Sequence, residues 1–103
     1  MRKLGIIGGM SWVSTATYYE RINRIVQKRS PPMASAPLLI ESLDFCDLYA
    51  LREENDWKRA AGVLIDSARR LEAAGAEGLI IGANSMHRLY DEVAAAVGIP
   101  ILH

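Results

Sequence analysis

Apolar and polar residues alternate along the chain in blocks that predict strands and helices in turn. Short apolar runs closed by glycine, proline or polar residues are typical of buried strands. We expect such strands at residues 4–7, 38–40, 79–81 and 99–102. Longer segments carry apolar residues at spacings of three and four, which gather on one face of a helix. We expect helices at about residues 15–28, 44–49, 57–74 and 86–97.

Polar residues and glycine mark where these helices begin and end. Ser11 or Ser14 is suited to cap the first helix, and Asp44 and Asp56 are suited to cap the next two. Gly75 is placed to end the long third helix in a left-handed conformation. The apolar stripe that we expect the first helix to turn toward the sheet consists of Tyr18, Ile22, Ile25 and Val26.

The order β-α-β-α-α-β-α-β predicts a parallel sheet covered on both faces, with right-handed crossovers. We therefore predict an α/β fold: a three-layer αβα sandwich with a four-stranded parallel sheet. The length of 103 residues fits one domain over residues 1–103.

Composition narrows the class of protein. Twelve Lys and Arg oppose twelve Asp and Glu, and this balance argues against a nucleic-acid partner. No apolar run approaches the roughly 18 residues that a membrane span needs. The single cysteine, Cys46, excludes an internal disulfide and a multi-cysteine zinc site, so we predict no metal and a reducing, cytoplasmic location. We expect Cys46 to be a buried, inert thiol, and Trp12 and Trp57 to anchor the packing, Trp12 alternatively walling a pocket.

Candidate chemistry lies in the loops that follow the strands, because ligands of open α/β sheets bind at the carboxyl ends of the strands. The first loop, residues 8–14, has neither the spacing of a dinucleotide site nor a phosphate-binding lysine. Its small residues and the helix start behind it suit a carboxylate, although a tight turn alone also explains them. Asn84 and Ser85 either cap the fourth helix or donate to a ligand carboxylate, and Arg52 either binds a carboxylate or is an exposed residue of a helix end.

Several segments together resemble the aspartate/glutamate racemase family. They include Gly-Ile-Ile-Gly-Gly-Met-Ser-Trp at 5–12, Asp-Phe at 44–45, Asp-Trp at 56–57 and Asn-Ser-Met-His at 84–87. The resemblance covers essentially the whole chain, and the first and last of these motifs form a strong joint signal.

The resemblance implies a cofactor-independent (PLP-independent) amino-acid racemase built from two similar α/β domains. The substrate, an aspartate- or glutamate-like amino acid, would lie in the cleft between them. Each domain would present one acid/base residue, typically cysteine, to opposite sides of the α-carbon. The positions that the resemblance places against the substrate are Met10, Ser11, Arg52, Glu53, Glu54, Asn84, Ser85 and Met86.

Two departures from the family pattern change this expectation. The acid/base position immediately before Asn84 holds Ala83, whose methyl group cannot transfer a proton. The resemblance also ends where the family continues into its second domain, so this chain would supply one half of a pseudo-symmetric two-domain fold, the carboxylate-binding half. We expect a fragment of a longer protein, with its C-terminal domain missing, rather than a stand-alone domain that completes the cleft with a second subunit as a homodimer.

Two other functions stay open at this point. The chain could be a non-catalytic amino-acid- or dicarboxylate-binding or assembly module, which Ala83 and the missing half both favour. It could also belong to a related isomerase or lyase that removes a proton with one base. Fold alone does not choose among them.

Overall fold

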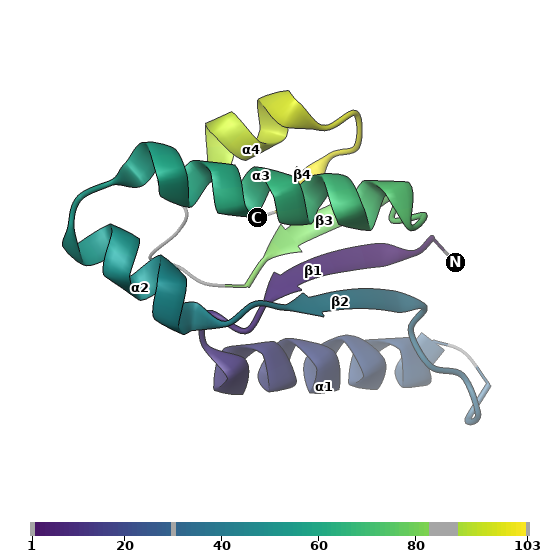
Figure 1. Ribbon diagram of the computed structural model, residues 1–103. Coiled ribbons are helices and arrows are strands. Elements are labelled where there is room, and N and C mark those ends of the chain that lie inside the picture. Colours follow the sequence, from purple (N-terminus) through teal and green to yellow (C-terminus); the bar gives the residue numbers. More distant parts are fainter. Residues whose placement is uncertain (1, 30, 83–88, 103) are drawn as a thin grey trace.

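The computed structural model describes residues 2–29, 31–82 and 89–102 of the chain. Strands and helices follow one another in the predicted order (Figure 1). The elements are β1 (Leu4–Gly8), α1 (Trp12–Arg29), β2 (Leu38–Ser42), α2 (Phe45–Glu53), α3 (Trp57–Ala73), β3 (Gly78–Ile81), α4 (Tyr90–Ala96) and β4 (Ile101–Leu102).

The strands form one parallel sheet in the order β2-β1-β3-β4. The first strand lies inside the sheet, where Ile6 pairs with Ile40 on one side and Ile80 on the other. Helix α1 covers one face, and α3 covers the opposite face with α4 packed against it (Figure 1). The structure therefore confirms the predicted three-layer α/β sandwich.

The predicted helix ends are confirmed at four positions. The Asp44 carboxylate accepts the backbone N–H of Cys46 at 2.9 Å, and the Asp56 carboxylate accepts that of Arg59 at 3.2 Å. The Ser11 hydroxyl accepts the N–H of Ser14 at 3.4 Å at the start of α1. Gly75 ends α3 with a φ of +107°, a conformation that costs glycine little.

Several elements differ in length from the prediction: α1 begins at Trp12, before the expected residue 15, and β2 continues to Ser42. Two further differences have a local cause. Helix α2 continues to Glu53, because nothing in residues 50–53 breaks it and Leu51 packs against the core. Strand β4 begins at Ile101, because Pro100 has no N–H to donate and pairs only through its carbonyl, which accepts the Leu79 N–H at 2.9 Å. The helix predicted over 86–97 is observed as α4, and residues 86–88 lie outside the described part of the chain.

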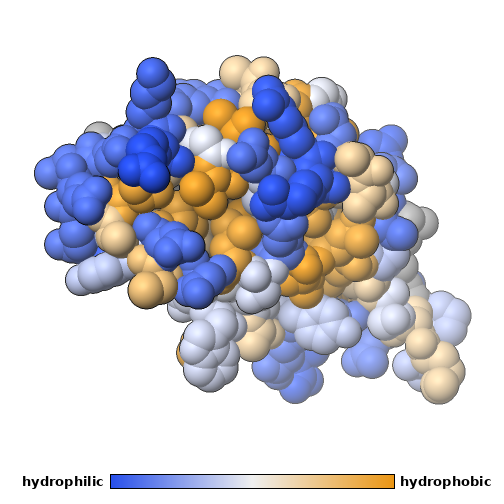
Figure 2. All heavy atoms as spheres, in the orientation of Figure 1, coloured by the Kyte–Doolittle hydropathy of each residue, from blue (hydrophilic) through white to orange (hydrophobic). Residues whose placement is uncertain are grey.

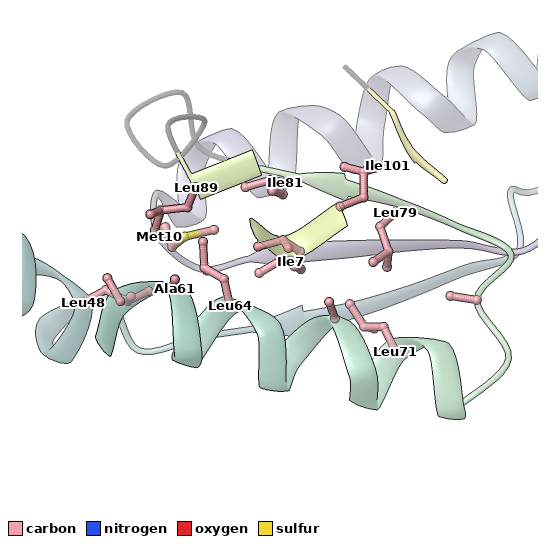
Figure 3. Packing of buried hydrophobic residues seen from close by; sticks show 14 residues of the cluster. Ile7, Met10, Leu48, Ala61, Leu64, Leu71, Leu79, Ile81, Leu89 and Ile101 are labelled. Carbon is pink, nitrogen blue, oxygen red and sulfur yellow. The ribbon is translucent and has the colours of Figure 1, made fainter. Parts of the chain in front are cut away.

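The main core lies between the sheet and α3. Ile7 and Leu79 point from neighbouring strands toward Leu64 and Leu71 of the helix (Figure 3). Ile7, Leu64 and Leu79 are completely buried. Each such aliphatic side chain contributes about 1.5–3 kcal/mol by leaving water, so this layer dominates the stability of the sandwich.

The layer on the α1 side is packed far less completely. All 18 residues of α1 are described, and Thr15 is the one that is buried. Tyr18, Ile22 and Val26 are half-buried, as their predicted place against the sheet implies, but Ile25 is 54% exposed. The expectation for Ile25 was wrong because successive helix residues turn by about 100°, which leaves it on the flank of a stripe centred on Ile22 and Val26.

Two further burial expectations were wrong, and one is confirmed. Trp12 is 73% exposed, because it begins α1 outside the sheet, whereas Trp57 packs against the core as predicted. Cys46 is exposed, because α2 turns Leu48 inward and places Cys46 on the opposite side of the helix. Hydrophobic atoms remain visible in the middle of one face of the molecule, between hydrophilic side chains around them (Figure 2).

The end of β1 holds three segments together. The Leu43 N–H, after β2, donates to the Gly8 carbonyl at 2.8 Å, and the Gly82 N–H, after β3, donates to the Ile7 carbonyl at 2.9 Å. Gly9 has a φ of +84°, and a Cβ added there would lie 2.1 Å from the Leu43 oxygen. The loops after β1 and β2 can therefore meet only if residue 9 has no side chain.

An ion pair links the edge strand β2 to α3. The Arg70 Nε lies 2.9 Å and 3.1 Å from the two carboxylate oxygens of Glu41, and the Arg70 Nη2 contacts the same group. This contact lowers the pKa of Glu41, against desolvation, which raises it. The buried Ser67 hydroxyl makes no hydrogen bond within the described part of the chain, but it stands near enough to Glu41 to lower the pKa of that carboxyl group further.

Replacing Gly9 should damage the fold in a way that replacing another glycine does not. We expect Gly9→Ala to lower the free energy of unfolding by about 3 kcal/mol or more, through the strained φ and the clash with Leu43. Gly62→Ala is the matched control, because a Cβ at this helix position meets nothing within 4 Å and should raise stability by up to about 1 kcal/mol. Urea unfolding followed by circular dichroism measures both, and equal effects would contradict the steric argument.

The Glu41–Arg70 pair should make stability depend on pH. A carboxyl group whose folded pKa is lowered stabilises the fold above its ordinary pKa, and this contribution is lost as the pH falls through the folded pKa. We expect Glu41→Gln to cost about 0.5–1 kcal/mol at pH 7 and progressively less as the pH falls from the ordinary pKa of 4.5 through the lowered pKa of the folded state. Urea unfolding between pH 7 and pH 3 measures the difference. Glu20→Gln, which removes a pair exposed on both sides, should change stability less at every pH.

Candidate functional site

The loop between β1 and α1 presents the start of a long helix at the carboxyl edge of the sheet. Ser11 is exposed and caps α1 through its hydroxyl oxygen, as one of the two predicted caps. The backbone N–H groups of Ser11, Trp12 and Val13 donate no hydrogen bond to any residue that the structure describes. All three residues are exposed.

The charge at this end of α1 favours an anion. Aligned peptide dipoles give the start of a helix a partial positive charge. The first turn of α1 carries no acidic side chain to neutralise it, and the last turn carries Lys28 and Arg29, which complement the opposite end. A carboxylate is the kind of ligand that such a helix start can hold.

Met10 is buried, whereas the next residue, Ser11, is exposed. The Met10 side chain is buried in the core beside Leu89 (Figure 3). The prediction that the backbone around Met10 faces a ligand therefore concerns main-chain atoms only, and the side chain fixes the loop to the core.

Thr15 connects this loop to α1. Its hydroxyl oxygen accepts the Gly9 N–H at 3.0 Å and donates to the Ser11 carbonyl at 3.3 Å. The sequence analysis did not single out this residue. A threonine four residues after a cap, on a helix that follows two glycines, is the signal that could have drawn attention to it, because such a hydroxyl can reach back to the preceding turn.

Arg52 lies near the end of α2 and is supported by two aromatic rings. Its guanidinium carbon is 5.6 Å from the centre of the Phe45 ring and 5.1 Å from that of Tyr49, and the two rings meet edge to face. These distances are those of cation–π contacts. The spacing of four and three residues along one helix brings the three side chains together, which is a signal that the sequence contained.

The arginine keeps its donors available in this position. Its nearest acidic group among the described residues is Glu53, with 3.9 Å between Nη2 and Oε1, too far for a hydrogen bond. Its side chain is 30% exposed. A guanidinium whose face rests on rings can still offer its edge to a carboxylate.

Of the remaining predicted residues, the structure describes two and leaves the others outside its described part. Glu53 and Glu54 are exposed at the end of α2, where the backbone N–H of Glu54 closes the helix on the Ala50 carbonyl at 3.1 Å. No hydrogen bond or ion pair joins Ser11 to Arg52. The residues of the third loop that were predicted to act lie outside the described part of the chain: Ala83, Asn84, Ser85 and Met86.

Within the described ranges, no three His, Cys, Asp or Glu side chains are grouped to hold a metal ion. None of the described helices is long and apolar enough to cross a membrane.

Comparison with known proteins shows to which family this chain belongs. The sequence model of the Asp/Glu/hydantoin racemase family matches residues 7–103. A broad specificity amino-acid racemase of Bacillus subtilis is 29% identical over 105 residues, which are 97% of this chain and 44% of that protein.

Two solved structures have the same fold as this chain and match nearly all of it. A Yersinia pestis protein assigned as an Asp/Glu racemase is 42% identical with a TM-score of 0.97, covering 100% of this chain and 45% of its own. An aspartate racemase homologue from Pyrococcus horikoshii is 32% identical with a TM-score of 0.90, covering 99% and 44%. The chain thus spans less than half the length of these relatives, and it belongs to the Asp/Glu/hydantoin racemase family.

Proposed function

We propose that this chain is the carboxylate-binding half of a cofactor-independent amino-acid racemase that acts on an aspartate- or glutamate-like substrate. The observation that carries the proposal is the exposed start of α1, where the N–H groups of Ser11, Trp12 and Val13 have no acceptor among the described residues. Membership of the racemase family supports an amino acid as the source of the carboxylate.

Holding the carboxylate contributes to the chemistry as well as to binding. Removal of the α-proton leaves a carbanion that pushes charge onto the carboxylate oxygens. Fixed N–H donors and the positive end of a helix dipole stabilise this charge without having to reorganise. We assign this stabilisation of the carboxylate charge to the backbone N–H groups of Ser11–Val13 and to the Ser11 hydroxyl. Arg52 is proposed as a second carboxylate donor, with Glu53 and Glu54 beside it.

Proton transfer requires groups beyond those of this half. Ala83 occupies the position where the family pattern has an acid/base side chain, and it offers no exchangeable proton. Asn84, Ser85 and Met86 are proposed to contact the substrate beside it. Transfer would then depend on the other half of the cleft, or the reaction would use a single base, as a related isomerase or lyase does.

The relatives are more than twice as long as this chain, and we propose that a second half completes the cleft. The thinly packed α1 side supports a packing partner, because Trp12, Ile25 and Leu102 remain exposed there. That half would be a C-terminal domain or a second copy of the chain in a homodimer. A cytoplasmic location is part of the same proposal.

Aspartate should bind at the start of α1. We expect L- or D-aspartate to shift the backbone amide resonances of Ser11, Trp12 and Val13 in two-dimensional NMR spectra of the protein. Ethanolamine, which has the ammonium group without a carboxylate, should leave them unchanged. Shifts confined to other elements, or equal shifts with both compounds, would remove the basis of the proposal.

The second candidate function is a non-catalytic amino-acid-binding module, which Ala83 favours. Exchange of the aspartate α-proton in heavy water separates it from a racemase, because any exchange catalysed by the protein excludes binding alone.

Ala83→Cys should add the acid/base side chain that the family pattern has at this position. Since positioned acid/base groups contribute on the order of a hundredfold, we expect α-proton exchange to rise by about that factor over the unchanged protein. NMR measures it as loss of the aspartate α-proton signal. Ala73→Cys, at an exposed position near the end of α3, is the matched control and should have no effect. The exchange is measured with both halves of the proposed cleft present, and a folded Ala83→Cys protein with unchanged exchange would then mean that position 83 is not the acid/base position.

A further inference from the structure

Thr15 is placed differently from the other residues of its helix. It is the buried residue of α1, and it lies directly against the end of the central strand. A Cβ added at Gly8 would lie 2.7 Å from both Cγ2 and Oγ1 of Thr15. The side chain therefore fills the space that the missing side chain of Gly8 leaves, and it fixes the distance between α1 and β1.

The Thr15 hydroxyl ties both ends of the Gly9–Ser11 loop. The Gly9 N–H donates to Oγ1 at 3.0 Å, and Oγ1 donates its own proton toward the Ser11 carbonyl at 3.3 Å. The same carbonyl also accepts the Thr15 N–H at 3.0 Å. One side chain thus determines where the loop leaves the strand and where the helix begins.

This arrangement also divides the loop's N–H groups into two sets. The Gly9 N–H is occupied by Thr15 and is withdrawn from any ligand. The N–H groups of Ser11, Trp12 and Val13 are left without an acceptor among the described residues. The direction in which they point follows from the orientation of the peptide units that the Thr15 hydroxyl holds.

We propose that Thr15 is a positioning residue that orients the backbone donors of Ser11–Val13 for the substrate carboxylate. The inference rests on the proposed function, because it assigns to a buried hydroxyl the geometry of the carboxylate site. Thr15 does not touch the ligand; it acts through Gly9 and Ser11. Removing its hydroxyl leaves the Gly9 N–H without its acceptor and frees the loop to rotate.

The helix supplies its own matched control in Thr17. This residue has the same side chain, and its hydroxyl also donates to the carbonyl four residues earlier, that of Val13, at 3.1 Å. Thr17 is exposed and makes no hydrogen bond to the Gly9–Ser11 loop. Thr15→Val and Thr17→Val therefore remove the same hydroxyl from the same helix, and only the first change affects the loop.

The experiment measures L-aspartate affinity by calorimetry and the hydrogen exchange of the Gly9 amide by NMR. We expect Thr15→Val to weaken affinity on the order of tenfold and to speed Gly9 exchange, since small displacements of binding groups have large effects. Thr15→Ser keeps the hydroxyl and should retain wild-type affinity even if loss of the methyl group lowers the melting temperature. Thr17→Val should match the wild type in both readouts.

The outcomes separate the two proposals. If the wild type binds aspartate and Thr15→Val binds it equally well, the positioning role is wrong and the proposed function stands. If Thr15→Val does not fold, Thr15→Ser decides: wild-type affinity supports the hydroxyl, and loss of affinity shows that packing alone is responsible. If the wild type does not bind aspartate, the carboxylate site itself is wrong, and the role of Thr15 is withdrawn with it.

Discussion

The rest of the structure depends on the close approach of backbone segments at the end of β1. The last two carbonyls of this strand accept the N–H groups of Gly82 and Leu43, which begin the loops after β3 and β2. Gly9 then passes so near to Leu43 that no side chain fits between them. The carboxyl edge of the sheet is therefore assembled by main-chain contacts, and the start of α1 is fixed at that edge before any ligand is considered.

The two faces of the sheet differ because their helices bury different amounts of apolar surface. The α3 side holds a continuous core, in which Ile7, Leu64 and Leu79 are completely buried (Figure 3). On the α1 side the sole buried helix residue is Thr15, and Ile40 stays 39% exposed on β2. The fold is thus anchored from one side, and its other side retains apolar surface that suits a packing partner.

We propose that carboxylate binding and proton transfer are separable in this chain. The carboxylate donors that we propose include the main-chain N–H groups of Ser11, Trp12 and Val13, which are present whatever side chains these residues carry. The acid/base group of the family pattern is a single side chain, and we propose that Ala83 stands at its position in this chain. A chain can therefore keep the geometry that stabilises a substrate carboxylate while the chemistry at the α-carbon depends on another part of the protein.

The sequence by itself determined the order of elements, the parallel three-layer fold and the caps at Asp44 and Asp56, because these follow from local periodicity and short-range hydrogen bonds. It also identified the family, through motifs that are contiguous in the chain. Only the tertiary structure decided that Cys46 is exposed, that Arg52 rests on two rings and that Thr15 holds the site loop. Those properties depend on which face of a helix meets its neighbours and on how closely separate segments approach, and spacing along one chain does not specify either.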